Sequence, residues 1–206
     1  MPHAPMGQIR KVCVYCGSSP GTDPAFVAAA ARLGEIFAEA GIGLVFGGGS
    51  AGLMGAIAKA MQARSGEIVG IIPEFLVARE RMFRGAHEVV VTRGMHDRKQ
   101  LMFERSDAFV ALPGGIGTLE ELVEQLTWAQ LGRHKKPILI ANLNGFWDGL
   151  LGLFEHMDRA GFIHSAARLN FLVVDNVEDI LPALTRAAAA VPEEEKEGEP
   201  ETVERM

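Results

Sequence analysis

The residues Leu44-Val45-Phe46-Gly47-Gly48-Gly49-Ser50-Ala51-Gly52 run from a short apolar segment into a cluster of glycines. The apolar segment is typical of a buried β-strand, and the residues from 51 onward have the apolar spacing of a helix. Within the turn, Gly47, Gly49 and Gly52 match the spacing G-x-G-x-x-G. A strand, a glycine turn and a helix in this order form the phosphate-binding element of doubly wound α/β proteins.

The rest of the chain repeats this alternation. Short β-rich apolar runs lie at 11–15, 43–46, 68–72, 88–92, 108–112, 137–141 and 171–174. Helix-patterned stretches lie between them at 24–40, 51–64, 95–106, 118–131, 146–160 and 177–190, and Gly41 follows the first, where a helix C-terminal glycine is expected. Most of the strand runs are apolar throughout, as in parallel strands covered on both faces. The pattern predicts a Rossmann-like, doubly wound parallel sheet of about seven strands with helices on both faces.

Length and charge indicate one folded domain with a different tail. A chain of 206 residues fits a single domain, predicted here over 11–191 after a flexible N-terminus at 1–10. The segment 192–206 is predicted to be a disordered acidic tail, because its seven glutamates against Lys196 and Arg205 account for five of the six net negative charges. The remaining near-neutral body disfavours nucleic acid as the main partner.

The sequence has no apolar run near the ~20 residues that a membrane-spanning helix needs, and its first residues lack a signal-peptide core. We therefore expect a cytoplasmic protein without a membrane partner.

Cys13 and Cys16 are the only two cysteines. A redox C-x-x-C motif belongs at a helix N-terminus, whereas this pair lies on an apolar strand run, where a spacing of three places the sulfurs on opposite faces. Reduced core thiols are the favoured interpretation, and a redox or metal role is the alternative. His96 has no second His or Cys at ligand spacing, so no metal is expected.

The first glycine turn predicts binding of a phosphate group through backbone N–H groups of Gly48, Gly49 and Ser50. A dinucleotide is one alternative, with Glu74 after the next strand as the acidic partner of the ribose. Tight packing of strand against helix is the other.

A second turn, Pro113-Gly114-Gly115-Ile116-Gly117-Thr118, follows the strand run 108–112. It offers further backbone donors and a hydroxyl at a helix start, which suits one small phosphorylated ligand held between the two turns. Glu121 follows Thr118 by three residues, so the pair could be a capping box with Thr118 as N-cap. The alternative is a carboxylate that faces the ligand. Glu120 lies about 100° further round the helix and is expected to point elsewhere.

Arg98 and Lys99 lie at another predicted helix start, where two cations oppose the helix dipole. The surrounding segment 79–105 carries seven basic residues against four acidic ones. A negatively charged ligand nearby would explain these cations, and a solvated charged face is the alternative.

Taken together, the motifs resemble a known family. Residues 113–121 match P-G-G-x-G-T-x-x-E, and the same chain carries the glycine turn 47–52 followed by Leu-Met-Gly, the Arg98-Lys99 pair and Thr-Trp-Ala-Gln-Leu-Gly at 127–132. Over residues 11–190 the chain resembles the LONELY GUY family of cytokinin-activating phosphoribohydrolases, long labelled lysine decarboxylases. The resemblance implies a Rossmann-like homodimer that hydrolyses N6-modified adenosine 5′-monophosphates to the free base and ribose 5-phosphate.

The resemblance also implies roles for individual residues. Arg98 and Glu121 correspond to the catalytic pair, and no cofactor or metal is implied. Substrate contacts are expected from Gly48, Gly49, Ser50, Glu80, Arg98, Lys99, Gly114, Gly115, Ile116, Gly117, Thr118, Leu119, Glu120, Glu121 and Thr127.

The chemistry of the reaction agrees with this assignment. N-glycosidic hydrolysis passes through a transition state that resembles an oxocarbenium ion, so it needs a carboxylate to activate water or stabilise positive charge. Glu121 fits that role, while Arg98 suits orientation and electrostatic stabilisation because it does not readily give up its proton.

Three other functions are compatible with parts of the sequence to different degrees. A non-catalytic carrier or sensor of a nucleotide or pterin cofactor would use the same turns and is the main alternative. A DNA-processing protein is disfavoured by the neutral body. A lysine decarboxylase would need a Schiff-base lysine for pyridoxal phosphate, and the sequence marks no such set of residues.

The segment 127–131, with Trp128, is expected to contribute to a homodimer interface.

Overall fold

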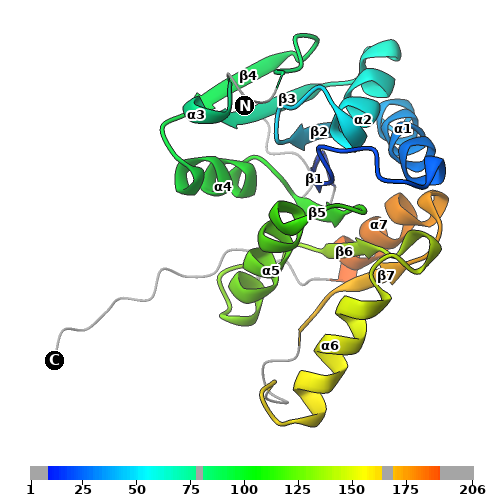
Figure 1. Ribbon diagram of the computed structural model, residues 1–206, viewed down its shortest axis with the longest axis vertical. Helices are drawn as coiled ribbons and strands as arrows, with labels where there is room; N and C mark the ends of the chain where they lie inside the picture. Colours follow the sequence, from blue (N-terminus) through cyan, green and yellow to red (C-terminus); the bar gives the residue numbers. More distant parts are fainter. Residues whose placement is uncertain (1–8, 78–80, 164–168, 191–206) are drawn as a thin grey trace, which may run out of the picture.

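A computed structural model describes residues 9–77, 81–163 and 169–190. Its centre is one seven-stranded sheet (Figure 1). The strands are β1 (Lys11–Tyr15), β2 (Gly43–Phe46), β3 (Ile68–Pro73), β4 (Glu88–Thr92), β5 (Ala108–Ala111), β6 (Ile138–Ala141) and β7 (Leu172–Val174). All seven predicted strands are confirmed, and each end agrees within one residue.

The sheet is parallel throughout, with the strand order β4-β3-β2-β1-β5-β6-β7. From β1 the chain first adds strands on one side as far as β4 and then returns to add β5 on the other side. β1 and β5 pair from Val12 with Ala108 to Tyr15 with Ala111. The strand order therefore reverses between β1 and β5, which is where a doubly wound sheet opens a crevice at its carboxyl edge.

Helices cover both faces of the sheet. They are α1 (Pro24–Glu39), α2 (Gly52–Ala63), α3 (Glu74–Val77), α4 (Met95–Glu104), α5 (Ile116–Gln130), α6 (Asp148–Arg159) and α7 (Ile180–Ala190). One apolar core joins the sheet to α1, α2 and α7, and the other joins it to α4, α5 and α6 (Figure 1). The predicted fold class, a Rossmann-like parallel sheet between two helical layers, is confirmed.

Successive residues of the central strand β1 face the two cores in turn, as expected for a β-strand. Cys13 and Tyr15 face the core under α4 and α5, whereas Val12, Val14 and Cys16 face the core under α1 and α2. The prediction that the two cysteines lie on opposite faces is confirmed. Both thiols are free and buried, and burial raises their pKa well above the ordinary value, so they stay protonated.

Helix starts differ from the sequence-based prediction more than strands do. The helix predicted from residue 146 begins at Asp148, after a short 3₁₀ turn (Leu143–Gly145) in which Asn144 has a positive φ of 52°. The helix predicted from 177 begins at Ile180 behind a second 3₁₀ turn (Val177–Asp179). The four-residue helix α3 is missing from the prediction, because one turn leaves no periodic pattern to read.

The structure describes only part of the predicted terminal segments. Residues 1–8 of the predicted N-terminal segment and the whole acidic segment 192–206 lie outside the described residues. Ile9 is buried in the core, and the backbone N–H of Arg10 donates to the Asp107 carboxylate at 2.8 Å. None of the helices in the described ranges is long and apolar enough to cross a membrane.

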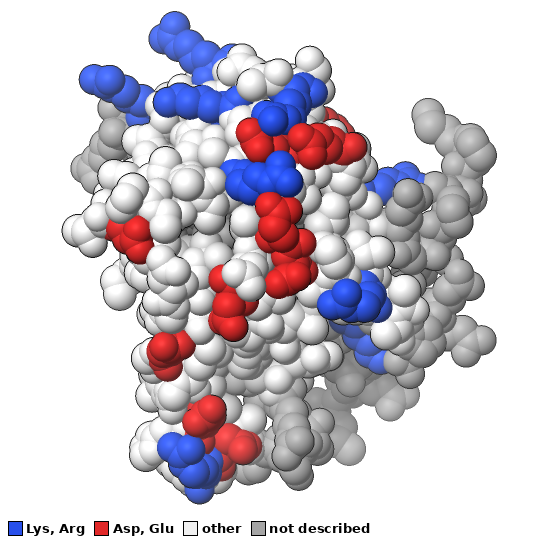
Figure 2. All heavy atoms as spheres, turned by 90° about the vertical axis from the view of Figure 1, so that its right-hand side faces the viewer, with Lys and Arg blue, Asp and Glu red and all other residues white. Residues whose placement is uncertain are grey.

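Several charged side chains on the surface form ion pairs. Figure 2 shows acidic and basic side chains next to one another over one face of the molecule. Ion pairs of this kind join α1 to α2, where Arg64 lies 2.9 Å from Glu35 and 3.2 Å from Glu39. Arg32 of α1 pairs in the same way with Glu178, at 2.8 Å. These ion pairs link α1 to α2 and to Glu178 before α7.

Candidate active site

Several predicted site residues meet in a cavity of about 270 Å³ at the carboxyl ends of β1 and β5, the point where the strand order reverses. Its wall consists of Val14, Tyr15, Cys16, Gly17, Ser18, Gly47, Met54, Met95, Arg98, Gly115, Ile116, Gly117, Thr118, Glu120 and Glu121. A neighbouring cavity of about 370 Å³ shares Gly17, Ser18 and Gly115 with it and adds Gly114. The site is therefore assembled from the first turns of α4 and α5 and from the loops after β1 and β2.

The first turn of α5 forms one end of this cavity. Gly115 is its N-cap, and no side chain caps the helix. The first N–H groups of a helix have no partner within it, so those of Ile116 to Thr118 are available to an anion. At Gly115 and Gly117 the space that a Cβ would occupy is open. The turn thus has the geometry of an anion site at a helix N-terminus.

The capping-box interpretation of Thr118 and Glu121 is wrong. The helix begins at Ile116, two residues earlier than predicted, so Thr118 already lies inside its first turn. Thr118 is buried beside Gly114, and Glu121 lies one turn further along. A capping box needs the carboxylate three residues after the cap, and Glu121 lies six residues after Gly115, so it does not form one.

Arg98 and Glu121 form a pair in the cavity wall. Nη2 of Arg98 lies 3.4 Å from Oε1 of Glu121, and only 9% and 11% of their side chains are exposed. Nε of Arg98 also donates to the backbone oxygen of Ile71 at 3.1 Å, and Nη1 contacts the sulfur of Met95 at 3.8 Å. A charge pair this well removed from water acts more strongly than it would at the surface. The two residues predicted to be catalytic are therefore brought together.

Lys99 points away from the cavity although it follows Arg98 directly. Its Nζ donates to Oε1 of Glu120 at 2.5 Å and to Oε2 of Glu124 at 2.7 Å. Burial alone would lower the pKa of Lys99, but the hydrogen bonds to Glu120 and Glu124 outweigh it and raise the pKa above the ordinary value. Lys99 therefore joins α4 to α5 and does not line the cavity.

Glu120 occupies a different place from the one expected. Its side chain is half exposed and borders the cavity as well as binding Lys99, whereas its angular position on the helix predicts that it faces elsewhere. A long side chain at a helix start can turn toward a neighbouring cation, which position on the helix alone does not reveal.

The first glycine turn contributes only Gly47 to the cavity. Beyond it, the turn pairs with the segment 81–83: Ser50 N–H donates to the Arg81 oxygen at 2.8 Å, and Phe83 N–H donates to the Gly48 oxygen at 2.8 Å. Gly49 forms a bridge with Met82 in the same place. Gly48, Gly49 and Ser50 therefore support a neighbouring loop and lie outside the cavity wall.

The loop after β1, which contains Gly17 and Ser18, lies between the two turns and was not predicted to belong to the site. Gly17 N–H donates to the Pro113 oxygen at 3.1 Å, and its own carbonyl accepts from Leu53 N–H of α2 at 3.0 Å. Ser18, the next residue, lines the cavity. The available signal was a glycine and two serines directly after the first strand, the position that a dinucleotide fold uses for phosphate.

The remaining predicted residues lie elsewhere. Leu119 packs against the core beneath α5, and the exposed Thr127 donates its hydroxyl to the Val123 oxygen of its own helix at 2.8 Å. Glu74, the acidic residue of the dinucleotide alternative, is exposed at the start of α3. Glu80 lies outside the described residues. Within the described residues, no group of three or more His, Cys, Asp or Glu side chains is placed to hold a metal ion.

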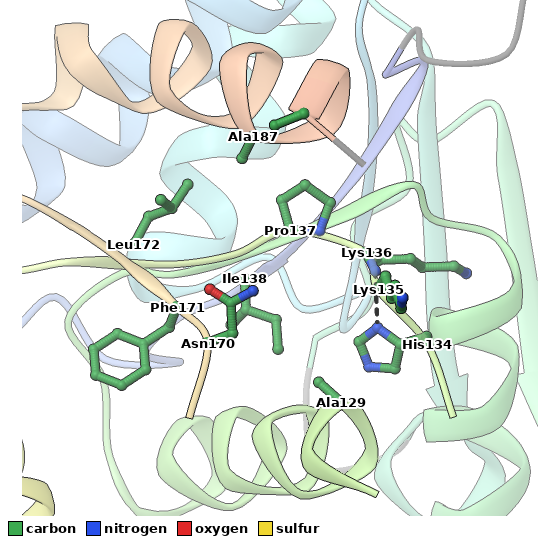
Figure 3. A pocket seen from close by; sticks show the side chains of 11 residues that line it. Ala129, His134, Lys135, Lys136, Pro137, Ile138, Asn170, Phe171, Leu172 and Ala187 are labelled. Atoms are coloured by element: carbon green, nitrogen blue, oxygen red, sulfur yellow. Dashed lines mark hydrogen bonds between the residues drawn. The ribbon is translucent and has the colours of Figure 1, made fainter. Parts of the chain in front are cut away.

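A separate cavity of about 370 Å³ lies near the amino ends of β6 and β7 (Figure 3). Nδ1 of His134 accepts from the backbone N–H of Lys136 at 3.1 Å there. The ammonium of Lys136 is already bound to the Phe103 oxygen at 2.7 Å and lies over the Phe103 ring. Because no predicted site residue lines it, this cavity is not the candidate active site.

Comparison with known proteins agrees with the motifs. A family described as "Possible lysine decarboxylase" matches residues 54–184. The chain is 45% identical over 183 residues, 89% of its length and 80% of the relative's, to "Probable cytokinin riboside 5′-monophosphate phosphoribohydrolase LOG4" of Oryza sativa subsp. japonica. It is 41% identical to "Cytokinin riboside 5′-monophosphate phosphoribohydrolase LOG7" of Arabidopsis thaliana, over 86% of this chain and 82% of that one.

Solved structures extend the likeness of the fold. The molybdenum cofactor (Moco) carrier protein of Chlamydomonas reinhardtii matches with a TM-score of 0.68 over 89% of this chain and all of the other, at 21% identity. At that identity the match concerns the architecture alone. The matches in sequence, by contrast, extend over most of the chain at more than 40% identity. The chain belongs to the LONELY GUY family.

Proposed function

We propose that this protein hydrolyses the N-glycosidic bond of N6-modified adenosine 5′-monophosphates and releases the free base and ribose 5-phosphate. The observation that carries the proposal is the buried Arg98–Glu121 pair, 3.4 Å apart, beside an uncapped helix N-terminus. The curated relatives that cover most of the chain are named for this reaction. The carrier alternative has weaker support, because its structural counterpart is only 21% identical.

The phosphate of the substrate is assigned to the first turn of α5. The N–H groups of Ile116, Gly117 and Thr118 and the positive end of the helix dipole favour a dianion there. Ser18, on the loop after β1, faces the same cavity and can donate its hydroxyl. Binding at this remote group would hold the sugar in place, so that its binding energy serves to position the reacting bond.

The reaction itself is assigned to Glu121. In hydrolysis the bond between C1′ and the purine nitrogen breaks, the oxygen of a water molecule bonds to C1′, and the departing purine nitrogen takes up a proton. An ionised Glu121 can accept the proton of the attacking water and stabilise the positive charge that develops on the ribose. The guanidinium of Arg98, 3.4 Å from this carboxylate, orients it toward the reacting bond.

The other substrate contacts follow from position. Gly114, Gly115, Ile116, Gly117, Thr118 and Glu120 border the two adjoining cavities and are assigned to direct contact. Gly48, Gly49, Ser50, Lys99, Leu119 and Thr127 lie outside these walls, so we assign them to supporting the site. Glu80 remains a prediction from the family resemblance.

We further propose a cytoplasmic homodimer. α5 leaves apolar side chains in water: Ile116 is 81% exposed and Leu131 is 77% exposed, with Val123 also exposed between them. Apolar groups gathered along one helix favour association with a second copy. Light scattering at micromolar concentration should give twice the mass of one chain, and a monomer would refute the assignment.

The test of the function is a product assay. The purified protein is incubated with isopentenyladenosine 5′-monophosphate and, separately, with AMP, and the free base and ribose 5-phosphate are measured by chromatography. Release from either nucleotide, lost in Glu121→Gln, supports the proposal. Tight nucleotide binding without product would support the carrier alternative and refute hydrolysis.

A further inference from the structure

The backbone conformation at position 47 does not require a glycine. Gly47 follows β2 directly and begins the first glycine turn. Among the described residues, the glycines of this turn with positive φ are Gly48, at 79°, and Gly52, at 57°. Gly47 has no such angle, so any residue could adopt its backbone conformation. If a side chain is excluded at position 47, the cause must therefore lie in the neighbouring atoms.

The space beside Gly47 is occupied by Arg98. A Cβ built on Gly47 would overlap Nη2 of Arg98, and it would lie 3.5 Å from Cζ of the same side chain and 3.2 Å from the sulfur of Met54. The guanidinium thus lies directly against the backbone of the turn. A methyl group on residue 47 would therefore force Nη2 of Arg98 to move.

The displaced atom would be the one that faces Glu121. Nη2 is the nitrogen that lies 3.4 Å from Oε1 of Glu121. The other two nitrogens of the guanidinium are held on the far side, Nε by the Ile71 oxygen and Nη1 by the sulfur of Met95. With Nε and Nη1 engaged, Nη2 is the nitrogen that faces Glu121, and it occupies the space that a side chain at position 47 would fill.

We propose that Gly47 is a positioning residue of the active site, whose missing side chain makes room for the Arg98 guanidinium beside Glu121. The inference rests on the proposed function for its kinetic consequence, and on geometry alone for the placement of Arg98. It gives the first glycine of the G-x-G-x-x-G spacing a role other than phosphate binding. In this chain the glycine accommodates a cation of the protein itself.

The test is Gly47→Ala with Gly149→Ala as the matched control. Gly149 lies in α6, remote from the cavity, and an added Cβ there meets nothing within 4 Å. Because the atom that must yield is the end of a flexible side chain, Gly47→Ala should fold with an unfolding midpoint close to that of the wild type. Its kcat should fall about 10- to 100-fold, as expected when a reacting group is displaced by about an ångström, while KM changes by less than about threefold.

A double substitution separates positioning from a general structural effect. Arg98→Lys lacks Nη2, so adding Gly47→Ala to it should leave kcat almost unchanged, although the same substitution lowers kcat in the wild type. Equal losses in both backgrounds, or a Gly47→Ala enzyme with wild-type kcat, would overturn the proposal.

A crystal structure of Gly47→Ala tests the placement independently of turnover. The guanidinium should move away from Glu121, and a guanidinium that stays within 3.5 Å of Oε1 would refute the inference. If the wild type proves inactive on every nucleotide tested, the proposed function fails, and this structure still decides whether Gly47 places Arg98.

Discussion

Replacing Lys99 by methionine tests whether this cation binds substrate or holds two helices together. Its side chain is 9% exposed and its ammonium lies between the carboxylates of Glu120 and Glu124. Methionine has a similar length and fills the same space, so the main change is the loss of one positive charge. Two carboxylates would then remain near each other without their cation.

The size of the effect follows from the burial of each partner. Removing one member of a buried ion pair costs about 3–5 kcal/mol, because the remaining charge is left unpaired away from water. Glu120 is half exposed and can turn to solvent, whereas Glu124 is only 18% exposed and cannot do so easily. The cost therefore comes mainly from Glu124, and we expect Lys99→Met to lower the free energy of unfolding by about 3 kcal/mol.

Urea unfolding measures this loss, and a second substitution tests its cause. Lys99→Met combined with Glu124→Gln should recover about 1–2 kcal/mol relative to Lys99→Met alone, because the unpaired carboxylate is gone. KM for the nucleotide should change by less than about threefold. A KM raised by more than about tenfold with an unchanged free energy of unfolding would refute the argument and would place Lys99 in direct contact with the phosphate.

Three further predictions follow from other parts of the structure. Glu121→Gln should fold normally and lower kcat by about 10²–10⁴-fold, as measured by release of ribose 5-phosphate, because the amide cannot accept a proton from water. Burial, together with the charge of Lys136, lowers the pKa of His134 from 6.5 to about 4. Between these two pH values the unfolded chain therefore binds a proton that the folded chain does not. The free energy of unfolding should be highest above about pH 6.5 and fall by about 3 kcal/mol as the pH drops to 4. In a series of urea-unfolding measurements at different pH, His134→Gln should remove most of this fall. Gly52→Ala should destabilise the fold by more than about 2 kcal/mol in the same assay, because φ is 57° there and a Cβ would overlap the backbone of Ser18.

The fold could be predicted from the sequence because its strands are short, continuous apolar runs. A run such as 44–46, followed by glycines and an apolar helix, has few other interpretations in a chain of this composition. Helix starts were less predictable. α5 begins at Ile116 rather than Thr118 because Gly115 is its N-cap, and a glycine cap gives no polar side-chain signal.

The site was predictable at the level of turns and not at the level of atoms. Spacing places Arg98, Glu121 and the turn 113–118 at one edge of the sheet. It does not reveal that the segment 81–83 occupies the hydrogen-bonding groups of Gly48 and Ser50, because that segment is about thirty residues away in sequence. For the same reason the ligand of Lys99 was predicted to be a substrate anion, although two carboxylates of α5 supply the negative charge around it.

Under the proposed function, Arg98 and Lys99 link activity to stability, because both side chains join α4 to α5. They are consecutive on α4 and therefore about 100° apart around the helix, so one reaches Glu121 and the other reaches Glu120 and Glu124. Glu121 and Glu124 are separated by one helical turn, so any shift of α5 away from α4 lengthens both contacts together. Substitutions that weaken either contact should thus lower kcat as well as stability, because each leaves a buried charge without its partner. The two cations at the start of α4 are best explained by this division: one serves the reaction, and the other maintains the helix spacing that the reaction requires.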